Sequence, residues 1–363
     1  MRVKLEDVCE RGSSNIKQSD IIKMSGNYPI YGASGLAGKV NFYHQEQPYV
    51  AVVKDGAGIG RTTLNPAKSS VIGTMQYLIP KKNVLPEYLF YAVSYMHLEK
   101  YYTGATIPHI YFKDYKNEEF NLDNIEKQLE IIDVLGRCKK VIEARKQELV
   151  ELDSLTKARF VEMFGTLDIP TQAFEKATLK ELCNKITDGK HGGCKSEVGT
   201  ERYFVGAREI YDDDVHYESA PEINIEEFEK DYKRCNVEIG DFLIVNTGAT
   251  IGKSAIACDK RTEHTLLQKS VALLKVKKDV LNPIFLKWCY RVNTKMYMVE
   301  NASAQPNLLL SKINATVIYV PDIELQNQFA DFVHQVDKSK VAVQKALDET
   351  QILFDSLMQK YFG

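Results

Sequence analysis

The chain has 363 residues, which at roughly 100–200 residues per domain predicts two domains with connecting structure. Hydrophobic residues make up 44% and charged residues 26%, values that exclude a disordered chain. The formal net charge of −2 gives no basic excess, so any nucleic-acid contact needs basic residues gathered on one face, or a partner that supplies part of the phosphate contact.

The seven cysteines are scattered and form no C-x-x-C pair, which argues against a zinc ribbon or a redox motif. The pattern favours reduced thiols in a cytoplasmic protein. The opening MRVKLEDVCERG lacks an apolar signal region, and no apolar run reaches the length of a membrane span. We therefore expect a cytoplasmic chain with no membrane contact.

Residues 1–122 are predicted to form the first domain. Short apolar runs broken by glycine, such as YVAVVKDGAGIG (49–60) and SSVIGTMQYLIP (69–80), are typical of β-strands joined by turns. A helix is expected over 86–102, with Pro86 in its first turn.

Residues 123–165 are predicted to form a long central helix that begins at a capping box of Asp123 and Glu126. Apolar residues spaced by three, four and seven form one stripe along it: Ile125, Leu129, Ile132, Leu135, Ile142, Leu149 and Leu152. At 1.5 Å per residue such a helix is longer than a domain of this size is wide, so we expect it to pair with another helix.

Residues 166–320 are predicted to form the second domain, which repeats the pattern of the first. DFLIVNTGATIG (241–252) and KSVALLKV (269–276) are expected as strands, and a helix is expected over 283–297. A second long helix follows over 321–363. Its apolar stripe is Phe329, Phe332, Val336, Val343, Leu347, Phe354 and Leu357.

The two halves are copies of one another. The segment 105–165 matches 303–363 without a gap at an offset of 198, with twelve identical positions. Upstream, KDGAGIGRT (54–62) matches NTGATIGKS (246–254), and VKLEDVCERG (3–12) matches ATLKELCNKI (177–186). The intervening loops differ, so the frame is shared and the loops are not. We predict an α+β fold with an internal pseudo-twofold repeat, in which two mixed β domains are separated by two long helices paired as an antiparallel coiled coil.

The glycine turns suggest nucleotide binding but do not fit it. Gly248 and Gly252 enclose three residues, whereas a phosphate-binding P-loop needs four. Gly56, Gly58 and Gly60 are followed by RTTLNP, which is not helical, whereas a dinucleotide-binding fingerprint opens a helix. A tight turn between strands is the simpler interpretation. The alternative we keep is phosphate contact by basic residues at these turns, namely Lys54, Arg61 and Lys253.

Two further loops carry basic residues that are candidates for DNA contact. Lys190 and His191 lie in the glycine-bounded loop TDGKHGG (187–193), and Arg208 lies in FVGAREI (204–210). A solvated loop is the competing interpretation. His191 and Cys194 lack two further ligands nearby, so we predict no metal site, and we predict no cofactor.

The two-copy layout resembles the specificity subunits of type I restriction-modification systems. The resemblance covers nearly the whole chain. It rests on Y-P-I-Y-G-A-S-G (28–35), the G-A-x-I-G-[RK] turn in both copies, the I-E-x-Q helix start and the terminal F-G of each copy. It implies two target recognition domains that read an asymmetric, bipartite double-stranded DNA site. It also implies helices that bind two DNA adenine-methyltransferase subunits, with motor nuclease (restriction) subunits joining for cleavage.

Two other classes of function remain open. One is an enzyme, such as a nuclease or NTPase, but H-E-x-x-H, G-x-S-x-G and the amino-methyltransferase tetrapeptide are not found in the sequence. The other is an interaction scaffold whose β domains bind protein or glycan. We therefore expect a subunit that recognises DNA without catalysing a reaction.

Overall fold

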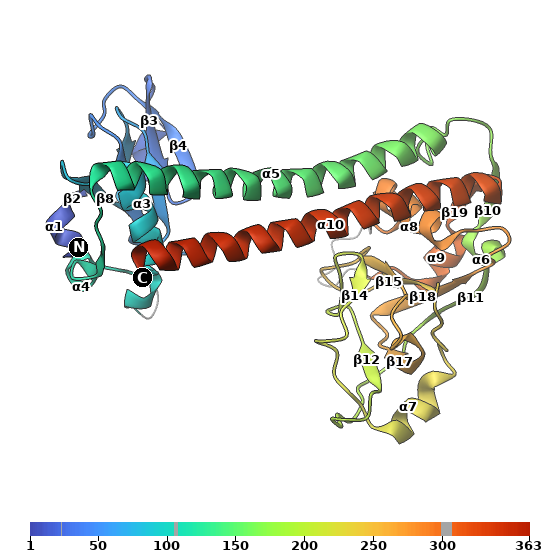
Figure 1. Cartoon of the computed structure of the whole chain (residues 1–363). Helices are drawn as coiled ribbons and strands as arrows, with labels where there is room; N and C mark the ends of the chain where they lie inside the picture. Colours follow the sequence, from blue (N-terminus) through green and yellow to red (C-terminus); the bar gives the residue numbers. More distant parts are fainter. Residues whose placement is uncertain (23, 105–107, 299–306) are drawn as a thin grey trace. The chain divides into compact units, whose positions relative to one another are not determined.

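The computed structural model describes residues 1–22, 24–104, 108–298 and 307–363. The chain divides into two units. Unit 1 comprises residues 1–148 and 343–363, and unit 2 comprises residues 149–342 (Figure 1). Two helices of 40 residues, α5 (Ile125–Phe164) and α10 (Ile323–Phe362), each begin in one unit and end in the other.

Unit 1 is built around the sheet β2-β8-β5-β6, whose neighbouring strands are antiparallel. A second sheet, β4-β3-β7, includes the parallel pair β3 and β7, and β1 pairs with β9. The strands are β1 (Arg2–Lys4), β2 (Cys9–Ser13), β3 (Tyr28–Gly32), β4 (Gly35–Val40), β5 (Tyr49–Val53), β6 (Thr62–Asn65), β7 (Ser70–Val71), β8 (Met75–Pro80) and β9 (Glu119–Asn121). The helices are α1 (Leu5–Val8), α2 (Gln18–Ile21), α3 (Pro86–Tyr95), the 3₁₀ helix η1 (Leu98–Tyr101) and α4 (Phe112–Tyr115).

Unit 2 repeats this topology. The sheet β11-β18-β15-β16 corresponds to the main sheet of unit 1, β12 and β17 are parallel as β3 and β7 are, and β10 pairs with β19. The strands are β10 (Glu175–Thr178), β11 (Cys183–Asp188), β12 (Tyr203–Val205), β13 (Ile210–Tyr211), β14 (Asp214–Val215), β15 (Phe242–Val245), β16 (Ser254–Ile256), β17 (Thr265–Leu267), β18 (Val271–Val276) and β19 (Val317–Val320). The helices are α6 (Leu179–Leu182), α7 (Ile225–Tyr232), the 3₁₀ helix η2 (Thr262–His264), α8 (Pro283–Val292), the 3₁₀ helix η3 (Thr294–Met296) and α9 (Leu310–Ala315).

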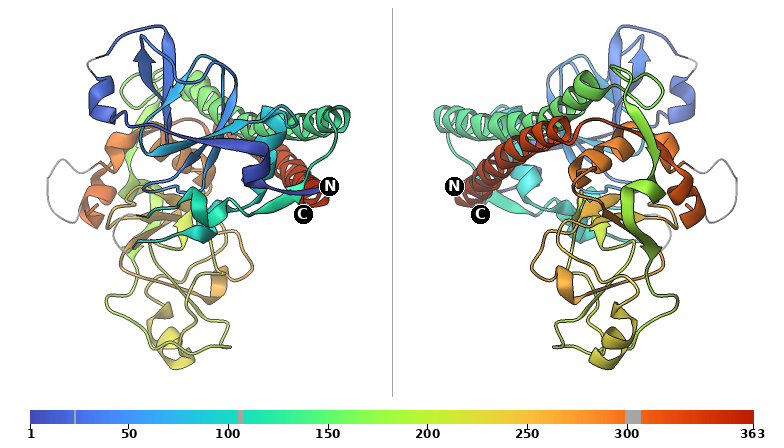
Figure 2. Two further views of the ribbon diagram at one scale, coloured as in Figure 1. Left: turned by 90° about the vertical axis from the view of Figure 1, so that its left-hand side faces the viewer. Right: turned by 90° about the vertical axis from the view of Figure 1, so that its right-hand side faces the viewer.

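The expected helix after each main sheet is shorter than predicted, and a 3₁₀ turn follows it. In unit 1 the break falls at His97, whose φ of 51° lies in the left-handed region and ends the helical path. In unit 2 the break falls at Asn293. The insertion that distinguishes unit 2 contains the hairpin β13–β14 and α7, which lies at the end of the unit away from α10 (Figure 2).

Each unit buries one end of α5 and the opposite end of α10. In unit 1 the core contains Ile131 and Leu135 from the first part of α5, together with Met358 and Phe362 from the end of α10. In unit 2 the core contains Phe160 and Phe164 from the end of α5, together with Phe329 and Val333 from the start of α10. The two helix segments in each unit therefore run antiparallel, and the residues at their contacts are related by the same offset of 198.

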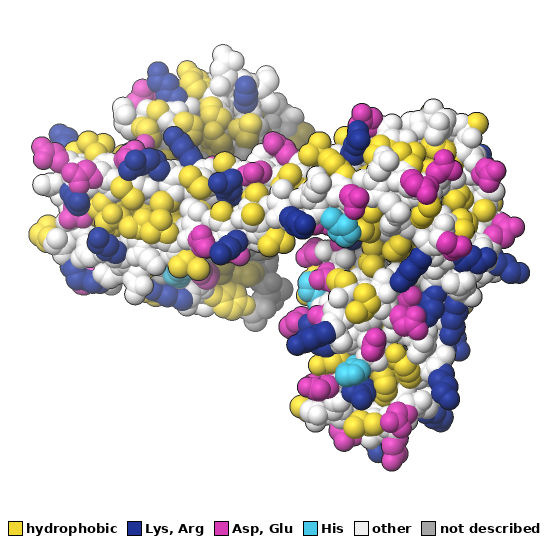
Figure 3. Space-filling model, turned by 45° about the vertical axis from the view of Figure 1, so that its right-hand side comes forward, with side chains coloured by type: hydrophobic (Ala, Val, Ile, Leu, Met, Phe, Trp, Pro, Cys, Tyr) yellow, Lys and Arg dark blue, Asp and Glu magenta, His cyan; other side chains and the backbone are white. Residues whose placement is uncertain are grey.

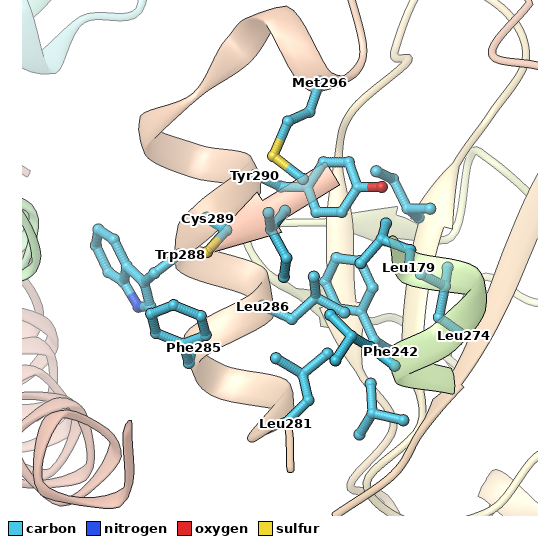
Figure 4. Close-up of a cluster of buried hydrophobic side chains, with 14 of the residues drawn as sticks. Leu179, Phe242, Leu274, Leu281, Phe285, Leu286, Trp288, Cys289, Tyr290 and Met296 are labelled. Carbon is cyan, nitrogen blue, oxygen red and sulfur yellow. The ribbon is translucent and has the colours of Figure 1, made fainter. Parts of the chain in front are cut away.

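Helix α8 joins the sheet of unit 2 to its long-helix segments. Figure 4 shows Trp288 on one side of α8 and Leu286 and Tyr290 on the other. The Trp288 ring meets Phe329 of α10 edge-on, with centroids 6.0 Å apart, and the Tyr290 ring stacks on Phe242 of β15 at 5.5 Å. All four side chains are buried, so one helix connects the two layers of the core.

The predicted apolar stripes need one correction. Leu129 is 56% exposed, whereas Gln128, Ile131 and Leu135 are buried. Because successive helical residues are rotated by about 100°, Leu129 lies beside the buried face rather than on it. Of the other expected contact residues, Leu135, Ile142, Phe329, Val336, Val343 and Leu347 are buried, and Ile132, Leu149, Leu152, Phe332 and Phe354 are partly buried.

The predicted capping box at the start of α5 is also wrong. The side chain of Asn124 accepts a hydrogen bond from the backbone N–H of Lys127 at 2.9 Å, so Asn124 caps the helix. Asp123 instead accepts a hydrogen bond from the Tyr88 hydroxyl at 3.2 Å.

Within the described part of the chain, no helix has both the length and the apolar character needed to cross a membrane.

Candidate nucleic-acid interface

The glycine turn of each copy is closed by the same pair of backbone hydrogen bonds, although Gly58, with a φ of 97°, is replaced by Thr250 in the second copy. In unit 1 it joins β5 to β6, and in unit 2 it joins β15 to β16, as the simpler interpretation of the sequence predicted. Equivalent residues are 192 apart. The matching bonds, from backbone N–H to backbone C=O, are Gly60 to Val53 (2.9 Å) and Gly252 to Val245 (3.0 Å), then Arg61 to Gly58 and Lys253 to Thr250 (both 3.1 Å). Arg61 and Lys253 therefore stand at equivalent places, and both are exposed.

A second set of backbone bonds aligns the loops beside these turns. Each N–H to C=O bond in unit 1 has a counterpart in unit 2, so the two surfaces can be compared residue by residue. The pairs of bonds are Ile72 to Tyr31 (2.9 Å) with Gln268 to Val205 (2.8 Å), Gly73 to Ile16 (2.8 Å) with Lys269 to Lys190 (3.0 Å), and Lys54 to Thr74 with Asn246 to Ser270 (both 3.0 Å).

In unit 1 these segments surround a pocket of about 610 Å³, which we call the first recess. The lining residues are Asn15, Ile16, Lys17, Gln18, Gly32, Ala33, Ser34, Ala37, Asp55, Ala57, Arg61, Ile72, Gly73 and Thr74. The paired bonds identify the counterparts of these residues in unit 2, and we call the following set of them the second recognition surface. They are Lys190, His191, Gly206, Ala207, Arg208, Thr247, Ala249, Lys253, Gln268, Lys269 and Ser270.

The alignment places five of the six predicted DNA-contact residues on these two surfaces. Arg61 lines the first recess, and Lys190, His191, Arg208 and Lys253 belong to the second recognition surface. The sixth, Lys54, is half-buried, and its ammonium lies 3.9 Å from the Asp55 carboxylate at the edge of the first recess.

The cations on these surfaces differ in whether they are already paired with a carboxylate of the same unit. Lys190 pairs with Asp231 at 2.7 Å and lies 3.8 Å from Glu227, and the hydrogen bond to Asp231 raises the pKa of Lys190. Its charge is therefore neutralised within unit 2, which argues against a free phosphate contact. His191 lies 3.1 Å from Asp188 and is otherwise exposed. Within the described residues, no ion pair or side-chain hydrogen bond is found for Arg208 or Lys253.

Arg61 also has a local structural role. One guanidinium N–H donates to the Ala33 carbonyl at 3.0 Å. The guanidinium passes over Gly58, where an added Cβ would lie 2.6 Å from Nη2. Gly58 also has a φ of 97°, and this left-handed backbone conformation favours glycine there. Among the described residues the Ala33 carbonyl is the one hydrogen-bond partner of the Arg61 guanidinium, so its other N–H groups can bind an anionic ligand.

Sequence reasoning missed the polar residues opposite these cations. In the first recess the Asp55 carboxylate lies 2.5 Å from Nδ1 of His109, and the backbones of the two residues form a bridge. The corresponding bridge in unit 2 joins Thr247 to Asn307, whose side chains lie 3.3 Å apart. Asp55 and Thr247 are 192 residues apart, as in the glycine turns, whereas His109 and Asn307 are 198 apart. The equivalence of the two bridges is therefore found only when both offsets are applied together.

Charge is unevenly distributed over the molecular surface. On the face shown in Figure 3, Lys and Arg side chains gather along one edge of unit 2, whereas acidic and basic side chains alternate along the helices. The near-neutral net charge therefore hides local basic regions, one of the two conditions under which the composition permits DNA contact.

Comparison with known proteins identifies the family. The family model described as "Type I restriction modification DNA specificity domain" matches residues 1–153 and 172–350. The chain belongs to this family. As a type I specificity subunit it recognises DNA for a restriction-modification system, as the resemblance of its sequence implied.

Solved structures share the fold of this specificity subunit. The S subunit of a type I restriction-modification system from M. genitalium matches with a TM-score of 0.61 at 15% identity, over 100% of this chain and 96% of that one. A chain solved in work on the complex assembly and conformational transition of the type I R-M system matches with a TM-score of 0.57 at 15% identity, over 99% and 97%. No curated protein sequence matches the chain.

Proposed function

We propose that this specificity subunit binds an asymmetric, bipartite double-stranded DNA site, one half through the first recess and the other through the second recognition surface. The observation that carries the proposal is that one backbone frame occurs twice with different side chains on it. The equivalent positions hold Ser34 and Arg208, and Asp55 and Thr247. Two copies of a frame with different side chains suit a site whose halves differ in sequence.

Arg61 and Lys253 would provide contacts to DNA phosphates, since both are exposed cations at the same place of the shared frame. Phosphate contacts position a protein on the duplex without selecting its sequence. In this proposal the cations at the glycine turns contribute affinity for DNA in both units. The side chains of the neighbouring loops, which differ between the units, select the bases.

The long helices would bind two adenine-methyltransferase subunits, and motor nuclease subunits would join the assembly for cleavage. Exposed apolar side chains along both helices support this role: Leu129, Val141, Val150 and Leu155 on α5, and Val341, Ile352 and Leu353 on α10. Exposed apolar residues on a helix already packed on one face favour a protein partner. We assign methyl transfer and DNA cleavage to the partners and no catalytic step to this cytoplasmic chain.

The test is reconstitution with the methyltransferase encoded beside this chain. We expect a complex of two methyltransferases per specificity subunit, with salt-dependent binding to a DNA sequence found by mapping methylated adenines in the host genome. Failure to form the complex would contradict the proposed partner. Binding of glycan or protein without any DNA shift would instead favour an interaction scaffold.

A further inference from the structure

The most informative difference between the two surfaces lies at one turn. In unit 1, β3 and β4 are joined by Ala33 and Ser34, with Gly32 paired to Gly35. In unit 2 the corresponding turn runs from Gly206 to Glu209, closed by a backbone bond of 3.3 Å between them. The Gly-Ala pair is common to both turns, and the next residue, at the tip, is Ser34 in one unit and Arg208 in the other.

The turn in unit 2 is held by several contacts that do not involve Arg208. The buried Glu209 carboxylate accepts a hydrogen bond from the Gly206 N–H at 2.8 Å, and the Ser270 hydroxyl accepts one from the Ala207 N–H at 3.2 Å. The Gln268 side chain lies against Gly206, where an added Cβ would be 2.5 Å from its Oε1. The backbone that presents Arg208 is thus fixed before any ligand binds.

The same position in unit 1 is built alike but has different chemistry. Ile72 lies against Gly32, where an added Cβ would be 3.0 Å from its Cδ1, just as Gln268 lies against Gly206. The glycine of the turn is thus covered by an isoleucine in unit 1 and by a glutamine in unit 2, and the tip carries a serine or an arginine. The bonds from Ile72 to Tyr31 and from Gln268 to Val205 are equivalent, whereas the strand after the turn pairs with β3 in unit 1 and with β14 in unit 2.

Arg208 is available for a ligand. Its side chain is exposed, and the described residues include no carboxylate paired with it, whereas Lys190 is paired with Asp231. A guanidinium presents two parallel N–H donors, which match the O6 and N7 acceptors of guanine in the major groove, whereas a serine hydroxyl distinguishes bases weakly.

We infer that Arg208 contacts a guanine in the half-site bound by unit 2, and that the tip position, Ser34 or Arg208, is a specificity-determining position of both units. This inference rests on the proposed function, because it assumes that these surfaces face DNA. The inference adds to the proposed function by assigning one residue, Arg208, to one base. The competing role for Arg208 is a phosphate contact, as assigned to Lys253 on the same surface.

The experiment uses the full chain assembled with its methyltransferase and a DNA pool randomised over both half-sites. For Arg208→Ala and Arg208→Gln we expect the preference for guanine at one position of one half-site to fall about tenfold to a hundredfold, with the other positions unchanged. Lys180→Ala is the control, because Lys180 is an exposed cation in α6, which precedes the end of β11 opposite Asp188. It should leave every position unchanged.

Ser34→Arg provides an independent arm in unit 1. We expect it to change the preferred base at one position of the other half-site, with guanine gaining. Equal weakening on all sequences by the Arg208 variants, with no change in base preference, would overturn the inference and assign Arg208 to phosphate. If the wild-type complex selects no sequence from the pool, the proposed function itself fails, an outcome distinct from an unchanged preference in the variants. Circular dichroism of each variant excludes misfolding.

Discussion

Gln128 and Gln326, 198 residues apart, make the same three hydrogen bonds in their two units. The side-chain oxygen of Gln128 accepts the Leu85 N–H at 2.8 Å, and that of Gln326 accepts the Asn282 N–H at 2.9 Å. The two amide groups donate to pairs of backbone carbonyls, at Asn83 (3.0 Å) and Asp123 (2.8 Å) in unit 1 and at Val280 (3.0 Å) and Pro321 (2.7 Å) in unit 2. Both side chains are fully buried, so each fastens the start of a long helix to the loop before α3 or α8.

Replacing either glutamine by leucine should destabilise its unit. Gln128→Leu leaves a buried N–H and two carbonyls without partners, at roughly 1–3 kcal/mol for each group that water cannot reach. We expect a total of about 2–4 kcal/mol, measured as a shift of the chemical unfolding transition. Gln344→Ala is the control, since Gln344 is exposed and its side-chain amide donates to Asp348 of its own helix. Equal effects from the two substitutions would contradict the fastening role.

Leu135 and Leu129 provide a matched pair on one helix. Leu135 is fully buried in the core of unit 1, so Leu135→Ala should cost about 2–4 kcal/mol in the free energy of unfolding. Leu129→Ala removes the same atoms from an exposed position and should change the stability of the free chain by less than about 0.5 kcal/mol. A large cost at Leu129 in the free chain would mean that the buried face of α5 has been assigned wrongly.

Charge reversal at the two glycine turns should weaken DNA binding without altering its sequence preference. Arg61→Glu and Lys253→Glu each remove a proposed phosphate contact, so the slope of log K against log salt should fall in magnitude by about 1 for each. Lys190→Ala should change the slope much less, because the Lys190 ammonium is already paired with Asp231. A titration of affinity against salt on target and unrelated DNA makes the measurement, and an altered base preference would count against phosphate contact.

The pair of Asp259 and Arg261 predicts a pH dependence for the stability of unit 2. Hydrogen bonds from the Arg261 guanidinium, at 2.8 and 2.9 Å, lower the pKa of Asp259 from 3.8 to about 2. A carboxylate with a lowered pKa stabilises the fold above its unfolded pKa of roughly 3.9, and this stabilisation is lost as the pH falls through about 2. Because both groups are partly exposed, we expect Asp259→Asn to cost only about 1 kcal/mol at pH 7.

The difference between wild type and Asp259→Asn should therefore be constant from pH 7 to about pH 5 and shrink between about pH 4 and pH 2. Urea unfolding of unit 2, followed at several pH values, makes the comparison. A difference that stays the same down to pH 2 would show that the lost contact does not depend on the ionised carboxylate.

The sequence predicted most of the frame because the frame depends on local signals. Glycine pairs such as Gly58 and Gly60 mark turns that need a positive φ, and Pro86 and Pro283 mark helix starts. The buried face of α5 was harder to predict, because either Leu129 or its neighbour Gln128 could lie on that face. Hydrophobicity favours the leucine, whereas the hydrogen bonds that bury the glutamine come from residues about forty positions earlier.

The candidate DNA surfaces were predicted only in part. Basic residues beside glycine turns are visible in the sequence, but which of them keeps a free charge depends on distant carboxylates, as Asp231 shows for Lys190. The equivalence of Ser34 and Arg208 was hidden because the loops between the matched segments differ in length. Only the shared Gly-Ala pair marked it, and two residues are too few to align without backbone hydrogen bonds.

The division of the chain into units implies an order of assembly during synthesis. Unit 2 is a continuous stretch, so all of its residues are available once position 342 has left the ribosome. Residues 1–148 of unit 1 are made before unit 2, yet Met358 and Phe362 belong to the core of unit 1 and are made after unit 2. Residues 1–148 therefore leave part of their apolar surface uncovered until residues 343–363 have been synthesised. A stop codon near position 343 would damage the beginning of the protein more than the middle.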